Sequence, residues 1–184
     1  MNVTTMKAAD ILVKNRDTFL KNDISSVIVR REYAMRSMIR GAAAGTVATA
    51  AMSAIMFGAR RSGVMGTMPP EKITASFLNR AGIKRSRKQQ DALAVAIHFI
   101  FGAGGGAIFG LAPERLPVPP VPLGMAYGSA IWAVSYMGWV PMLRIMPPPH
   151  RDQPGRQGVM LLGHLVYGGV LGVLTRRAYK RAAA

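Results

Sequence analysis

Two histidines are the residues of this chain whose type and spacing could do chemistry. His98 lies seven residues after Asp91, the last charged residue before one apolar run, and His164 lies eight residues after Arg156, the last charged residue before another. If both runs are helices, each imidazole lies about 10 to 12 Å beyond its charged boundary. Two crossings separate the two helices, so they run in the same direction. We therefore expect the two imidazoles at one depth on the same side.

Three interpretations of this pair stay open. Imidazoles from neighbouring helices can supply both axial ligands of a b-type haem, which makes His98 and His164 candidate cofactor-binding residues. They could instead belong to a path for protons or a small solute. Alternatively, each neutral ring hydrogen-bonds a backbone carbonyl or a hydroxyl and locks helix contacts, which is the ordinary use of polar residues in membrane bundles. His150, in a proline-rich loop, is expected to be solvated.

Other familiar chemistry is missing from the sequence. The chain has no cysteine, which excludes disulfides, thiolate metal sites and cysteine nucleophiles. The glycine-rich stretch 102–107 lacks the Gly-x-Gly-x-x-Gly order of a dinucleotide-binding loop and a suitably placed acidic residue. No Walker A, His-Glu-x-x-His or Gly-x-Ser-x-Gly pattern occurs, and no carboxylate pair lies inside an apolar run. We expect no catalytic residue, no metal site and a protein that is not an enzyme.

The elements that must position the histidines are four uncharged runs, at about 41–59, 92–112, 121–143 and 158–175. A helix of nineteen residues, the length of the first run, covers roughly the ~30 Å hydrocarbon core of a bilayer. In lipid each backbone amide must be paired within its segment, and runs of this length and composition do so as helices. The sequence therefore predicts an all-α membrane bundle of four transmembrane helices over residues 41–175.

Charge is segregated from these runs. Half of the residues are hydrophobic, only 17% are charged, and the net charge is +16. Residues 1–40 are expected to form one or two basic amphipathic helices, with Asn22-Asp23 as the N-cap of the second, and residues 176–184 form a basic tail. The absence of an early apolar run argues against a signal peptide. The N-terminal segment is expected to lie on anionic lipid, with docking of a partner protein as the alternative.

A second basic cluster precedes the second run. Residues 67–82 are expected to form a short helix with prolines in its first turn, and the cluster that follows it consists of Lys84, Arg85, Arg87 and Lys88. No aromatic residues alternate with these cations, so nucleic acid is not the expected partner. Phosphate headgroups of the bilayer are the expected contact.

Orientation follows from the distribution of Lys and Arg across the membrane. The two sides receive nearly equal numbers, 13 on the side of the two termini and 11 on the other. This difference favours both termini on the cytoplasmic side, and insertion in both orientations stays open.

Glycines four residues apart occur in every run, a spacing that lets helix backbones approach closely in lipid. They are Gly41 and Gly45 in the first run, Gly102, Gly106 and Gly110 in the second, Gly124 and Gly128 in the third, and Gly168 and Gly172 in the fourth. This spacing predicts a tight bundle, with a homodimer or larger membrane complex as a further expectation. Trp139, near the end of the third run, is expected to anchor it at the interface.

These features resemble the YagU-like family of small bacterial inner-membrane proteins. The matching pieces are the glycine-rich first run, Pro69-Pro70, His98 at the start of a glycine-rich second run, and the segment from Gly163 to Gly168 in the last. The likeness covers roughly residues 41–175. It implies a multi-pass protein of the bacterial inner membrane, from an uncharacterised family without catalytic residues to carry over.

The expected function is that of a non-enzymatic membrane accessory, scaffold or assembly component, because no charged residue lies inside the runs. The first alternative is a b-type haem-binding electron carrier that uses His98 and His164. The second is a small transporter or channel.

Overall fold

The computed structural model describes the backbone of residues 3–111 and 118–182, and the side chains of residues 25–111, 118–153 and 155–175. Over these residues the chain is all-α, with helices, turns and loops and no strand. It divides into two compact units, residues 1–37 and residues 38–184, and the arrangement described below is that of the second unit. Side chains before residue 25 and those of the basic tail 176–184 lie outside the described residues.

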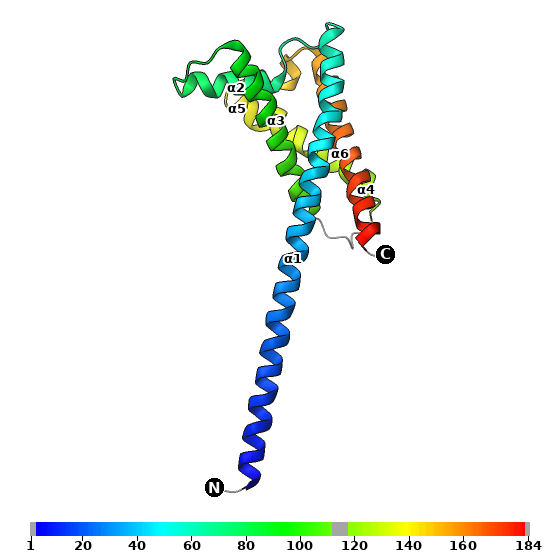
Figure 1. Ribbon diagram of the computed structural model, residues 1–184. Helices are drawn as coiled ribbons and strands as arrows, with labels where there is room; N and C mark the ends of the chain where they lie inside the picture. The colour runs from blue at the N-terminus through cyan, green and yellow to red at the C-terminus, as the bar shows by residue number, and fades with distance from the viewer. Residues whose placement is uncertain (1–2, 112–117, 183–184) are drawn as a thin grey trace. The chain divides into compact units, whose positions relative to one another are not determined.

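Figure 1 shows the helical elements of the described residues. They are α1 (Val3–Arg61), α2 (Pro69–Arg80), α3 (Arg87–Gly110), α4 (Pro120–Trp132), the π-helical segment η1 (Ala133–Trp139), α5 (Val140–Met142), the 3-10 turn η2 (Pro149–Arg151) and α6 (Pro154–Ala182).

Three helices are long and apolar enough to cross a membrane, namely α1 over Ser25–Arg61, α3, and α6 over Gly155–Thr175. The third expected helix does not form as one regular helix. It is divided into α4, η1 and α5, and within it the Val140 N–H bonds the carbonyl of Ser135, five residues back. Pro141 follows directly and has no N–H of its own, so the regular ladder cannot continue there.

The prediction of a new helix beginning at Asn22-Asp23 is wrong, because α1 is continuous from Val3 to Arg61. The first 40 residues contain neither glycine nor proline. With no residue that favours a break, the helix continues through the capping sequence.

The short helix expected at 67–82 is confirmed as α2. Prolines occupy its first turn and Glu71 lies beside them. The helix ends at Arg80, Gly82 two residues later has a left-handed φ of 69°, and the Ile83 N–H bonds the Leu78 carbonyl. Helix α3 then begins at Arg87, with Ser86 as its N-cap. The Ser86 hydroxyl accepts from the Gln89 N–H and the Gln89 side chain accepts from the Ser86 N–H, which makes a capping box.

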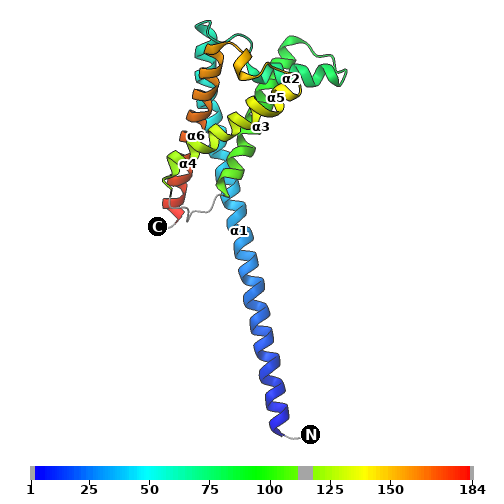
Figure 2. The ribbon, with the colours of Figure 1, turned by 180° about the vertical axis from the view of Figure 1, so that it is seen from behind.

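Backbones approach closely in two helix pairs, α1 with α3 and α4 with α6 (Figures 1 and 2). A Cβ added at Gly41 would overlap the carbonyl oxygen of Gly106, and one at Gly45 would overlap that of Gly102. In the other pair, a Cβ at Gly124 would overlap the Gly168 carbonyl oxygen. The remaining predicted glycines lie at the same two contacts: Gly110 against Gly41, Gly128 against the backbone of His164, and Gly172 against the backbone of Pro120.

Hydrogen bonds to α3 join the two pairs. The Tyr127 hydroxyl of α4 donates to the Gly105 carbonyl at 2.8 Å, and the Tyr167 hydroxyl of α6 donates to the Gly102 carbonyl at 2.7 Å. The core lies between the pairs and includes the buried residues Ala48, Met52, Met56, Tyr136, Tyr167 and Leu171.

Candidate functional site

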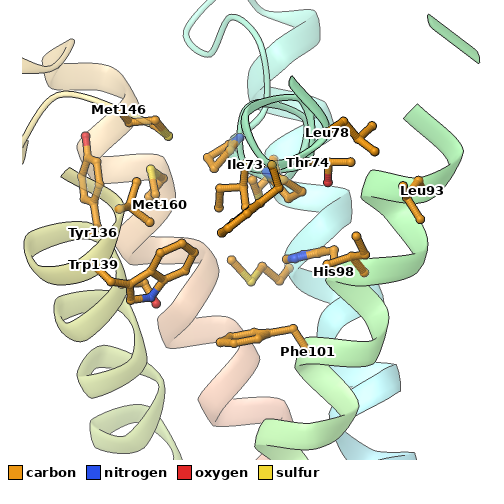
Figure 3. A pocket seen from close by; sticks show the side chains of 18 of the residues that line it. Ile73, Thr74, Leu78, Leu93, His98, Phe101, Tyr136, Trp139, Met146 and Met160 are labelled. Carbon is orange, nitrogen blue, oxygen red and sulfur yellow. The ribbon is translucent and has the colours of Figure 1, made fainter. Parts of the chain in front are cut away.

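A cavity of about 540 Å³ lies in the second unit, and every helical segment from α1 to α6 except α4 and η2 contributes to its wall (Figure 3). Residues from α1 and α6 that line it are Met52, Met56, Met160 and His164; those from α3 are Leu93, Ile97, His98 and Phe101; those from η1 and α5 are Ser135, Tyr136, Trp139 and Val140; the rest are Met146 and a set from and just after α2 that includes Pro69, Ile73, Thr74 and Leu78.

Helix α2 contributes its buried face to the cavity. Pro69, Thr74 and Leu78 are its buried residues, and all three line the wall. Ion pairs hold α2 in place: Glu71 lies 2.5 Å from Arg60 at the end of α1 and 3.9 Å from Arg87 at the start of α3. The Arg80 guanidinium also donates to the carbonyl of Leu143.

The π-helical segment positions the opposite wall. A π-helical turn has one residue more than an α-helical turn, so it changes which positions share a face. Ser135, Tyr136 and Trp139 of η1 and Val140 of α5 all face the cavity. Figure 3 shows Tyr136 and Trp139 on the side opposite α3.

A buried ion pair holds Tyr136. Its hydroxyl donates to Asp152 at 2.5 Å, and Arg156 donates to the other carboxylate oxygen at 2.9 Å. The side chains of Arg156 and Asp152 are only 7% and 3% exposed. Burial lowers the pKa of the nearby Lys72 amine below its ordinary value, and the positive charge of Arg156 lowers it further, whereas Asp152 raises it.

His98 and His164 both line this cavity, from α3 and α6 respectively. In Figure 3 the His98 ring points from α3 into the cavity, below Ile73 and Thr74 of α2. Both rings also line a smaller adjoining space of about 30 Å³ with Thr49, Gly102 and Tyr167. The structure thus brings together the two residues that the sequence placed at one depth.

The ring nitrogens differ in their partners. Nδ1 of His164 lies 2.8 Å from the Met160 carbonyl oxygen. Because a carbonyl oxygen only accepts, Nδ1 carries the proton, and in the neutral ring Nε2 then has a lone pair. Nε2 of His98 is buried, and among the described residues it has no hydrogen-bond partner.

The cavity is otherwise apolar. Of the described residues that line it, none is Asp, Glu, Lys or Arg. Its polar groups are the two imidazoles, the hydroxyls of Thr74, Ser135 and Tyr136, and the Trp139 indole. The Thr74 hydroxyl is buried and has no partner in the part of the chain that the structure describes. Such a lining suits a molecule that is largely apolar.

The α3 side of the cavity is also outer surface. Leu93, Ile97 and Phe101 line the cavity and are still 38%, 43% and 56% exposed. Val95 and Ile100 continue the exposed apolar surface of α3. The cavity therefore opens toward the apolar exterior of a helix that is long enough to cross a membrane.

The basic cluster predicted to bind lipid headgroups does not line the cavity. Lys84, Arg85 and Lys88 are exposed. Arg87 is exposed too but lies 3.4 Å from Asp91 as well as near Glu71, so this residue also braces α2 against α3.

Sequence reasoning missed most of the wall. The apolar face of residues 67–82 was visible, and its proximity to a membrane helix was the signal that it covers something. Trp139, expected as an interfacial anchor, also lines the cavity. Nothing in the sequence indicated that Ser135 or Thr74 would face it.

A model of one protein family matches residues 35–184, whereas no curated protein and no solved structure matches the chain. The matched region contains the whole cavity and starts close to the boundary of the second unit at residue 38. The YagU-like resemblance and the bacterial origin stay predictions. By this match over most of its length, the chain belongs to the family of unknown function DUF6789.

Proposed function

We propose that this protein is a non-enzymatic integral membrane protein that holds a largely apolar small molecule between its helices. The observation that supports this most is the cavity of about 540 Å³ with no Asp, Glu, Lys or Arg among its described lining residues. Its volume is in the usual range of small-molecule sites, about 300–1,000 Å³. The accessory or scaffold role suggested by the sequence does not require a cavity.

The molecule enters from the bilayer. Leu93, Ile97 and Phe101 are both cavity wall and exposed surface, at a level where α3 would face hydrocarbon. An apolar molecule dissolved in the bilayer reaches this opening without passing through water, and its transfer into the cavity costs little.

The broken third segment, residues 120–142, also crosses the membrane. Together with α1, α3 and α6 it makes a four-helix bundle. The Arg80 guanidinium bonds the Leu143 carbonyl, and a Cβ on Gly155 would touch Val64, so the connections 62–86 and 143–156 lie at one end of the unit. Helix α3 leads away from that end, and residues 120–142 must therefore return to it. The basic flanks then contact anionic lipid of the bacterial inner membrane.

Photolabelling tests the proposal. The probe is a long-chain alcohol that carries a diazirine, added to purified protein in nanodiscs. We expect saturable labelling of Met52, Met56 and Met160, prevented by excess unlabelled alcohol. Labelling that never saturates and maps only to the exposed surface would contradict the proposal.

A filled cavity provides the matched comparison. The double variant Ile97→Phe/Ser135→Leu adds bulk at two lining positions, one on each wall. The control Val95→Phe/Val134→Leu adds similar bulk at exposed positions that do not line the cavity. We expect the first variant to lose cavity labelling several-fold and the control to retain it.

A further inference from the structure

The second unit contains an internal repeat. In α3, His98 is followed by Gly102 and Gly106; in α6, His164 is followed by Gly168 and Gly172, each four residues after the last. Their partner helices meet them in the same register. Gly45 contacts Gly102 as Gly124 contacts Gly168, and Gly41 contacts Gly106 as Pro120 contacts Gly172.

The repeat makes His98 and His164 equivalent residues of two similar helix pairs. Each belongs to the second helix of its pair, one turn before the glycine contact, and both rings line the same cavity. The cavity thus receives one imidazole from each half of the unit. This arrangement suits a ligand that is held from two sides at one central atom.

The two ring nitrogens can serve as ligands of a metal at that position. Nε2 of His164 has a lone pair, because Nδ1 donates to the Met160 carbonyl. That lone pair can accept a hydrogen bond from a ligand or coordinate a metal, and a backbone bond at Nδ1 is the usual support of a metal-ligating histidine. Nε2 of His98 is buried without a partner among the described residues.

Two imidazoles are too few for an ion held by protein ligands alone, since a structural zinc site needs four. Within the described residues there is no group of three or more His, Asp or Glu side chains that could hold an ion. Haem iron takes four ligands from its own porphyrin ring and needs only two axial ligands from the protein.

We propose that the molecule held in the cavity is a b-type haem, with Nε2 of His98 and of His164 as its axial ligands; this inference rests on the proposed function. The apolar wall, with Phe101 and Trp139, suits the porphyrin faces and edges. Lys72, which adjoins Ile73 of the wall in α2, is a cation that suits the haem carboxylates.

Absorption spectra of the full chain test the inference. The protein is produced with added haem, purified in detergent, and measured oxidised and after dithionite. We expect a Soret band and, after reduction, the sharp visible bands of six-coordinate haem. His98→Ala and His164→Ala should each abolish these bands, whereas His150→Ala, at an exposed loop position, should leave them unchanged.

A ligand-replacing variant separates coordination from folding. His98→Met keeps an axial ligand, so haem should stay bound with a raised reduction potential, because thioether ligation favours the reduced iron. Alanine variants are compared only where they elute as a single species and still take up the photoreactive alcohol. Loss of haem in such a folded variant supports ligation, and bands unchanged in either alanine variant overturn it.

The two proposals fail in different ways. If the protein shows no Soret band but the alcohol labels the cavity, haem is overturned and the apolar-ligand function stands. If there is neither a Soret band nor saturable labelling, both are overturned.

Discussion

The Tyr167 hydroxyl donates a 2.7 Å hydrogen bond to the backbone carbonyl of Gly102 and so joins the two histidine-bearing helices. Tyr167 lies three residues after His164, and Gly102 lies four residues after His98. The bond therefore lies about one turn past both imidazoles and sets how far apart α3 and α6 stand at the cavity.

Tyr167→Phe should destabilise the protein by about 1 kcal/mol, because it removes an interhelical hydrogen bond from a buried carbonyl. Unfolding in mixed detergent and SDS micelles measures the change. Thr46→Val is the control, since the Thr46 hydroxyl is exposed and bonds the Ala42 carbonyl of its own helix. A Tyr167→Phe protein as stable as the wild type would mean that this bond is not formed in the membrane.

Gly106→Ala should force α1 and α3 apart, because the added Cβ would overlap the backbone of Gly41 and Gly45. Overpacking of this kind costs about 1–3 kcal/mol. Gly104→Ala on the same helix has open space around the added Cβ and should be neutral or slightly stabilising. The same unfolding assay compares them, and equal effects of the two substitutions would argue against the close α1–α3 contact.

Arg156→Met should destabilise the protein by about 3–5 kcal/mol, because it leaves the buried Asp152 carboxylate without its counter-ion. Arg36→Met is the control: Arg36 and Glu32 are 3.9 Å apart with side chains 73% and 66% exposed. Such a surface pair contributes less than about 1 kcal/mol. Adding Asp152→Asn to Arg156→Met should recover part of the loss, and thermal unfolding that ranks Arg36→Met as the more harmful change would refute this account.

Single cysteines test whether residues 120–142 cross the membrane, since the chain has no cysteine of its own. With four crossings, Ser62→Cys, Ser86→Cys and His150→Cys should all react with a membrane-impermeant maleimide from the same side of sealed vesicles. If residues 120–142 do not cross, His150→Cys should react from the side opposite to Ser62→Cys.

Much of the local structure could be predicted from the order of residues along the chain. The lengths of the apolar runs indicated α1, α3 and α6, and Pro69-Pro70 with Gly82 indicated the bounds of α2. Counting residues from Asp91 and Arg156 placed His98 and His164 at one depth. Pro141 indicated a break near the end of the third segment, but not the non-helical φ of −104° and ψ of −106° at Gly138, three residues earlier.

The sequence by itself determined the all-α architecture, the apolar lengths and the glycine spacing, because these depend on the rise and period of a single helix. Only the tertiary structure decided which glycines meet, since the same four-residue spacing occurs on all four segments and any of them could pair. It also decided that α2 and η1 face each other across a cavity and that Nδ1 of His164 donates to the Met160 carbonyl. These features depend on contacts between residues far apart in the chain, which the periodicity of one helix does not encode.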